Sequence, residues 1–238
     1  MDKKESRVIR MSVEGINCER LYFKHLAKLI NRSGSNMYNL KIDPKVRSPK
    51  QYARSIASLP QEKRKNNRKI PFFHIQDIED YYNDGFRRKF EEVISEMREA
   101  EEEWDLSYEM GYSNYTFELW MLLHAADMKY AIRDRYAYLD PINRWFNKRY
   151  KDLDEFKAEA EFQSILDQYV TLDSIWKAIK RAEKIKNANK DEGKKTMSYK
   201  NVEFYPDNPD LSIHLVVRQI LDICGVIKQE TPKNLNIS

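Results

Sequence analysis

Hydrophobic positions in the first half of the chain alternate between two kinds of spacing. Short runs rich in β-branched and aromatic residues, without helical spacing, predict strands at residues 7–13, 38–46, 70–75 and 106–112. Between them, apolar residues three or four positions apart predict helices at residues 17–32, 48–59, 85–104 and 117–127. Strands that alternate with helices are typical of an α/β fold built on a mostly parallel sheet.

The second half of the chain has a different pattern, because beyond Tyr130 the apolar positions are spaced almost wholly as in helices. The predicted helices are residues 131–138, 142–150, 156–169, 174–190 and 211–223, with a polar loop at 193–198. No internal repeat or low-complexity linker divides the chain. We therefore expect an α/β core over residues 1–128, with a helical part over residues 129–238 packed on the same core.

The amino-acid composition indicates a soluble globular protein and argues against several other classes. The 238 residues are 41% hydrophobic and 34% charged, which is typical of a soluble, helix-rich chain with a heavily charged surface. The two cysteines, Cys18 and Cys224, are too few and too far apart for a disulfide framework or a structural zinc site. No apolar run approaches the length of a membrane span and no signal segment opens the chain, so we expect a cytoplasmic protein without membrane insertion.

Charge is unevenly placed although the formal net charge is only +4. Residues 41–69 hold ten Lys or Arg against two acids, whereas residues 91–109 hold nine acids against one Arg. A basic segment beside a metal site is where a phosphate backbone would bind, and a solvated loop is the alternative. The predicted nucleic-acid-binding residues are Lys63, Arg64, Lys65, Arg68 and Lys69. A second basic face, for substrate or an acidic partner, comprises Lys177, Lys180, Arg181 and Lys184.

Carboxylates follow two of the predicted strands. Glu14 comes directly after the first strand, and Asp77 and Glu79 follow the third. Ligands of open parallel sheets bind outside the C-terminal ends of the strands, so these side chains are expected to converge. If the strand conformation persists, Asp77 and Glu79 point to the same side, and such hard oxygen ligands suit Mg²⁺ or Mn²⁺. The alternative is an acidic turn at the edge of the sheet.

Two further acids and one histidine have structural and functional interpretations. Glu19 and Glu118 lie in predicted helices among apolar neighbours, so each either orients a ligand or a basic side chain, or forms a plain buried ion pair. His74, inside the third strand, is more typical of a core or edge histidine than of a metal ligand.

Three motifs resemble the signatures of the RloB-like family. They are E-G-I-N-C-E-R-L-Y-F at residues 14–23, the pair Asp77-x-Glu79, and S-N-Y-T-F-E-L-W-M-L-L-H at residues 113–124. Looser matches at residues 178–185 and 208–216 extend the resemblance over nearly the whole chain. The chain departs from the family at Cys18, where Thr is usual, at Gln76, usually apolar, at Glu79, more often Asp, and at Tyr115, usually Pro.

The resemblance implies a Toprim-like core in which Glu14, Asp77 and Glu79 hold the metal, and Glu118 corresponds to the glutamate of the F-E-L-W motif. Because Glu79 has a longer arm than Asp, the metal spacing can differ, and Asp80 could substitute as a ligand. Family members are encoded beside restriction systems or an ATPase partner, which implies a role in defence against phage.

These observations predict a metal-dependent nuclease that cleaves DNA or RNA, with Glu14, Asp77, Glu79 and Glu118 as catalytic residues. One or two ions on the carboxylates would activate water and stabilise the charge of the transition state. The alternative is a non-catalytic module that uses the same core to dock on an ATPase partner. The sequence leaves the oligomeric state open.

Overall fold

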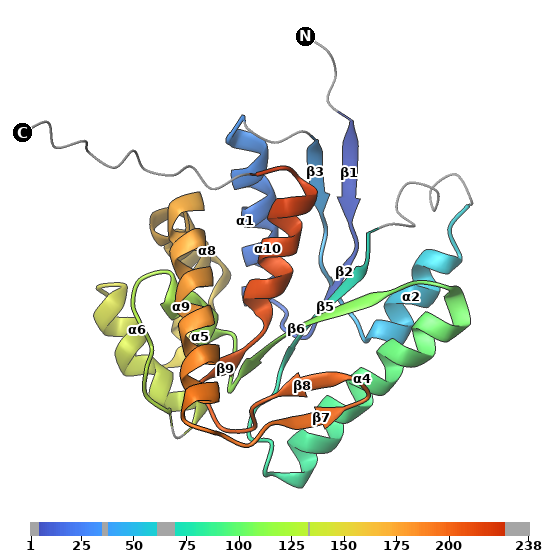
Figure 1. Ribbon diagram of the computed structural model, residues 1–238. Helices are drawn as coiled ribbons and strands as arrows, with labels where there is room; N and C mark the ends of the chain where they lie inside the picture. Colours follow the sequence, from blue (N-terminus) through green and yellow to red (C-terminus); the bar gives the residue numbers. More distant parts are fainter. Residues whose placement is uncertain (1–4, 35–37, 61–69, 133, 227–238) are drawn as a thin grey trace, which may run out of the picture.

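The computed structural model describes residues 5–34, 38–60, 70–132 and 134–226 (Figure 1). Its main sheet has five strands in the order β4 (Lys45–Val46), β2 (Met11–Val13), β5 (Phe72–Asp77), β6 (Tyr108–Asn114) and β9 (Asp210–Leu211). The first four strands are parallel, and β9 pairs antiparallel with β6. The prediction of an α/β fold with a mostly parallel sheet is therefore confirmed.

The first two predicted strands are each divided in the structure. Residues 7–13 contain the end of β1 (Ser6–Ile9) and all of β2, and residues 38–46 contain β3 (Asn39–Ile42) and β4. β1 and β3 form a separate parallel pair, whereas β2 and β4 belong to the main sheet. Pro44 lies at the second break, where its missing N–H cannot join a ladder of hydrogen bonds.

Helices cover both faces of the sheet (Figure 1). On one face, α2 (Pro49–Ala57) and α4 (Asp84–Trp104) pack together, and the buried residues Tyr52, Met97 and Phe72 meet there. The opposite face carries α1 (Cys18–Arg32) and α10 (Ile213–Ile223), which share a large core with Phe73 and Ile75 of β5. Successive strand residues thus point to opposite faces, so both faces of the sheet are buried.

The C-terminal part is helical, as predicted, but its boundaries differ. The predicted helix 117–127 is only the short α5 (Glu118–Leu123), and 131–138 contains a 3-10 helix at Arg135–Tyr138. The remaining helices are α6 (Leu139–Trp145), α7 (Leu153–Lys157), α8 (Glu159–Tyr169) and α9 (Leu172–Asp191). The predicted helix 156–169 is interrupted at Ala158, whose ψ of 133° is not helical.

The prediction that the chain beyond Tyr130 is almost wholly helical misses three short strands in the described residues, namely β9 and the two strands of a hairpin. β7 (Met197–Tyr199) and β8 (Val202–Phe204) form an antiparallel hairpin, and β7 takes in part of the predicted polar loop. Its turn residues Lys200 and Asn201 have φ values of 43° and 67°. Tight hairpin turns of this kind usually contain Asn-Gly or Asp-Gly. The turn here is Lys-Asn, so its sequence does not indicate a hairpin.

A single large cluster of buried apolar residues extends from Ile9 to Val226 and includes both the sheet and the C-terminal helices. The antiparallel pairing of β9 with β6 and the packing of α10 against β6 join the C-terminal part to the sheet. None of the helices in the described ranges combines the length and apolarity needed to cross a membrane.

Candidate active site

The parallel register of β2 and β5 brings Glu14 and Asp77 together. Val13 is opposite Ile75, and the Glu14 amide continues the ladder by donating to the Ile75 carbonyl at 3.0 Å. The Asp77 amide then donates to Oε2 of Glu14 at 3.1 Å. Both carboxylates therefore lie at the C-terminal end of the sheet, where parallel sheets bind ligands.

Glu79 also lies near Glu14 and Asp77, but its backbone is not in the strand conformation that the sequence predicts. The strand ends at Asp77, and Glu79 has a φ of 58°, so the assumption that strand alternation continues to Glu79 is wrong. This left-handed conformation costs a non-glycine residue roughly 1–2 kcal/mol. Two backbone hydrogen bonds hold it, from Ile78 to the Ser113 carbonyl and from Glu79 to the Tyr115 carbonyl, at 2.9 and 3.0 Å.

Two helix starts contribute Glu118 and Glu19. Glu118 is the first residue of α5, is only 2% exposed, and forms an ion pair of 2.6 Å with Nζ of Lys157. Glu19, in the first turn of α1, is also buried, and its carboxylate lies directly over Gly15. A Cβ atom at residue 15 would clash with both Glu19 oxygens, so the glycine of the E-G motif is needed for this close approach.

The buried carboxylates repel one another. Burial raises the pKa of Asp77 well above its usual range, and the negative charges of Glu19, Glu14, Glu118 and Glu79 raise it further. Burial also raises the pKa of Glu19 to about 7, with Glu118 and Glu14 adding to the effect. These acids therefore form one carboxylate cluster, which we define as Glu14, Glu19, Asp77, Glu79 and Glu118. Its negative charge favours binding of a cation.

Three basic side chains from distant segments contact the carboxylate cluster. Lys89 of α4 pairs with Glu14, Arg135 of the 3-10 helix lies 3.2 Å from Oε1 of Glu79, and Lys157 ends α7 beside Glu118. Sequence reasoning missed all three. Nothing local distinguishes them from other Lys and Arg residues, since each is 39 to 75 positions from its partner.

A buried polar chain supports Glu14 from inside the sheet. Ser12 and Nδ1 of His74 are 2.8 Å apart, Nε2 of His74 lies 3.2 Å from Oε1 of Gln76, and the Gln76 amide donates to Oε2 of Glu14. Burial lowers the pKa of His74 to about 4, so the ring is neutral and can donate from Nε2 while accepting at Nδ1. The expectation that His74 is a core residue agrees with this position. Gln76 stands where the family usually has an apolar residue, and its hydrogen bond to Glu14 explains the polar side chain at this position.

The donors of the carboxylate cluster are hard oxygens, which fit Mg²⁺ or Mn²⁺ by chemistry. Within the described ranges, however, no three His, Cys, Asp or Glu side chains are gathered closely enough to hold a metal ion. An ion at Glu14 would take the place of the Lys89 ammonium. The Asp80 side chain is already engaged in its own backbone turn, because its Oδ1 accepts a hydrogen bond from the Tyr82 amide at 3.1 Å. The metal-ligand roles of Glu14, Asp77, Glu79 and Asp80 stay predictions.

The predicted nucleic-acid-binding residues cannot be placed. Lys63, Arg64, Lys65, Arg68 and Lys69 lie outside the described residues. The second basic face, on α9, is partly neutralised by acids. Lys177 pairs with Asp173 at 2.6 Å, Arg181 lies 3.3 Å from Asp127, and Lys184 lies 3.7 Å from the same carboxylate.

Glu19→Gln should stabilise the protein at alkaline pH. The folded state holds the Glu19 proton up to a pH of about 7, whereas the unfolded chain releases it near 4.5. Neutral Glu19 therefore contributes stability that is complete below pH 4.5 and is lost as the pH rises through 7. Glutamine stays neutral, so we expect a gain of roughly 1–3 kcal/mol above pH 7 that vanishes near pH 4.

Denaturant unfolding in EDTA across this pH range measures the change in the free energy of unfolding. The control is Glu92→Gln, a substitution at an exposed position of α4. A constant difference between Glu19→Gln and wild type at all pH values would contradict the assignment of the raised pKa to Glu19.

Comparison with known proteins identifies one family. A family model described as RloB-like protein matches residues 9–220, which is most of the chain. No curated protein sequence and no solved structure matches the chain.

Proposed function

Since the chain belongs to the RloB-like protein family, we propose that the carboxylate cluster is the active centre of a divalent-metal-dependent nuclease that cleaves DNA or RNA. The observation that carries the proposal is that Glu14 and Asp77 meet where β2 and β5 end, with Glu19, Glu79 and Glu118 near enough to raise the pKa of Asp77. Buried carboxylates with raised pKa values cost stability, and they persist at functional sites because a bound cation relieves the repulsion.

Glu14, Asp77 and Glu79 are the residues that would hold the metal, in agreement with the family resemblance. When bound, the ion would activate water and stabilise the charge that develops on the phosphate. Glu118, paired with Lys157, and Glu19, packed on Gly15, surround these ligands with further negative charge. Ser12, His74 and Gln76 form the hydrogen-bonded chain that orients Glu14.

Lys89 and Arg135 have a second role in this proposal. Their side chains are 55% and 41% exposed, so each can leave its carboxylate without breaking the core. Once a metal ion neutralises Glu14 and Glu79, the two cations are available for the oxygens of the scissile phosphate. Cations aimed at a phosphoryl group stabilise the charge of its transition state.

The biological role follows from the family resemblance alone. We propose that the core is Toprim-like and that the nuclease is an effector of defence against phage, acting with an ATPase partner. The alternative is a non-catalytic module that docks on that partner. The internal ion pairs favour the alternative, because Lys89, Arg135 and Lys157 already balance three carboxylates without a metal.

The direct test is cleavage of end-labelled DNA and RNA, single-stranded and duplex, in Mg²⁺, Mn²⁺ or EDTA. We expect cleavage with either metal, none in EDTA, and a loss of activity in Glu14→Gln. Glu92→Gln, an exposed acid on α4, should cleave like the wild type. If the wild type cuts no nucleic acid with any divalent ion, with or without its ATPase partner, the binding module becomes the better interpretation.

A further inference from the structure

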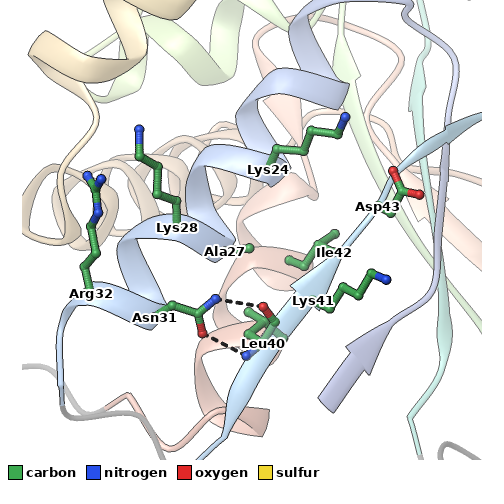
Figure 2. Close-up of a pocket in the computed structure, with 9 residues that line it drawn as sticks. All are labelled: Lys24, Ala27, Lys28, Asn31, Arg32, Leu40, Lys41, Ile42 and Asp43. Carbon is green, nitrogen blue, oxygen red and sulfur yellow. Dashed lines mark hydrogen bonds between the residues drawn. The ribbon is translucent and has the colours of Figure 1, made fainter. Parts of the chain in front are cut away.

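A basic groove lies between α1 and β3, and none of its lining residues belongs to the carboxylate cluster. It encloses about 570 Å³, and its lining is shown in Figure 2. Lys24, Lys28 and Arg32 come from α1, and Lys41 comes from β3. The groove also contains the apolar side chains of Ala27, Leu40 and Ile42, all buried. We define the basic groove by its four cations, Lys24, Lys28, Arg32 and Lys41.

The cations are regularly placed along the groove. Lys24, Lys28 and Arg32 are four residues apart, so they lie on one side of α1 at intervals of about 6 Å. Lys41 stands on the neighbouring strand, and all four side chains are exposed. Asn31 keeps the two walls together through a pair of hydrogen bonds with the backbone of Leu40, both 2.8 Å long. The basic side chains are therefore mounted on a rigid support.

The charge of the basic groove is only partly balanced by nearby acids. Its lining includes one carboxylate, Asp43, which is 2.5 Å from Lys45, and that lysine holds the pKa of Asp43 below its usual value. Lys28 lies 3.9 Å from Asp167, at the limit of an ion pair. Lys24 and Lys41 are near enough to Asp43 to help lower its pKa, but within the described ranges neither forms an ion pair with a carboxylate. The basic face of α9, by contrast, is largely paired.

The basic groove leads toward the carboxylate cluster. β3 continues into β4, and Val46 of β4 is the register partner of Val13, the residue before Glu14. On the other wall, α1 begins beside the cluster with Glu19, and Lys24 follows about 8 Å further along the helix axis. An extended polymer lying in the basic groove would therefore reach the carboxylate cluster from the end of the groove that holds Lys24 and Asp43.

We infer that the basic groove binds the phosphate backbone of the nucleic acid and guides it to the carboxylate cluster. The inference rests on the proposed function, because an acidic centre repels a polyanion and a nuclease needs a basic surface that offsets this repulsion. Three evenly spaced cations on α1, with Lys41 on the neighbouring strand, match a polymer that carries one charge per nucleotide. An acidic protein segment is the other occupant that the charge would allow.

The test is the salt dependence of binding. The variant Lys24→Gln, Lys28→Gln, Arg32→Gln, Lys41→Gln removes the four cations of the basic groove. The control Lys129→Gln, Arg144→Gln, Arg149→Gln, Lys151→Gln removes the same charge from exposed positions of the C-terminal part that belong to no predicted site. Fluorescence anisotropy with labelled DNA and RNA, measured in EDTA from about 50 to 200 mM KCl, gives the slope of log affinity against log salt.

We expect the slope of the groove variant to be shallower than that of the wild type by about 3, because each lost phosphate contact removes roughly 0.7 to 0.9. Its affinity at low salt should fall at least tenfold, while the C-terminal control keeps the wild-type slope. Equal slopes for the groove variant and the wild type would overturn the inference, as would a loss confined to the C-terminal control.

The binding experiment is independent of the proposed chemistry, since EDTA prevents metal-dependent cleavage in every sample. A wild type that binds nucleic acid through the basic groove but never cleaves it would contradict the nuclease and leave the groove supported. A wild type that cleaves, paired with a groove variant of unchanged affinity, would contradict the groove and leave the nuclease supported. Circular dichroism of each variant shows that it is folded.

Discussion

Asp77→Asn should abolish nucleic-acid cleavage while leaving the protein at least as stable as the wild type. Asparagine keeps the shape of the side chain and its contact with Ser113, 3.1 Å from Oδ1, but removes the charge needed to hold a metal. We expect a loss of roughly 10³-fold or more in the cleavage rate, because the variant removes an interaction made with the reacting centre.

Stability should move in the opposite direction to activity. Because the pKa of Asp77 is raised in the folded state, its ionised form costs stability at pH 8, and the cost disappears at acidic pH where the carboxyl is protonated in both states. Thermal unfolding in EDTA at pH 8 should therefore give an equal or higher Tm for Asp77→Asn. Asp84→Asn, an exposed position at the start of α4, is the control. An Asp77→Asn protein that melts well below the wild type would mark Asp77 as structural.

Lys157→Met should be the most destabilising of the substitutions considered. It leaves the Glu118 carboxylate, 2% exposed, without the ammonium 2.6 Å away. Removing one partner of a buried ion pair usually costs 3–5 kcal/mol, and the 27% exposure of Lys157 places the expected loss near the lower end, at roughly 3 kcal/mol. For a chain of this length such a loss lowers Tm by roughly 6–12 °C.

The double variant Glu118→Gln, Lys157→Met should recover most of that loss, because it removes the buried charge together with its partner. Lys177→Met provides a matched control, since Lys177 and Asp173 are also 2.6 Å apart but are 59% and 75% exposed. That change should cost less than about 1 kcal/mol. If Lys157→Met and Lys177→Met have the same effect on Tm, the pair of Glu118 and Lys157 is no more than a surface ion pair.

The position of Lys157 also explains why Glu118 was open to two interpretations. The buried ion pair is present, as the structural interpretation requires, and the same carboxylate raises the pKa of both Asp77 and Glu19, as a residue of the active centre would. The two roles are compatible. Glu118 belongs to the carboxylate cluster, and the ion pair with Lys157 offsets the free-energy cost of burying its charge.

Local pattern alone determined the alternation of strand and helix segments through Asn114, though not the division of the first two strands, and it determined the place of Glu14 and Asp77 at strand ends. Periodicity depends on neighbours a few positions apart, and the two acids directly follow or end their strands. Membership of the RloB-like family was also recognisable from contiguous motifs. Glu79 was placed near Asp77 for the wrong backbone reason, because its left-handed φ depends on hydrogen bonds to Ser113 and Tyr115, more than thirty residues away.

Only the tertiary structure decided which charges surround the acids. The contact of Lys89 with Glu14 spans 75 positions, and the chain from Ser12 through His74 to Gln76 crosses two strands paired only in the folded sheet. The basic groove depends on the same kind of proximity, since Lys41 joins Lys24 only when β3 lies beside α1. Interactions between distant residues form when the chain packs, and the identity of each residue alone does not specify its partner.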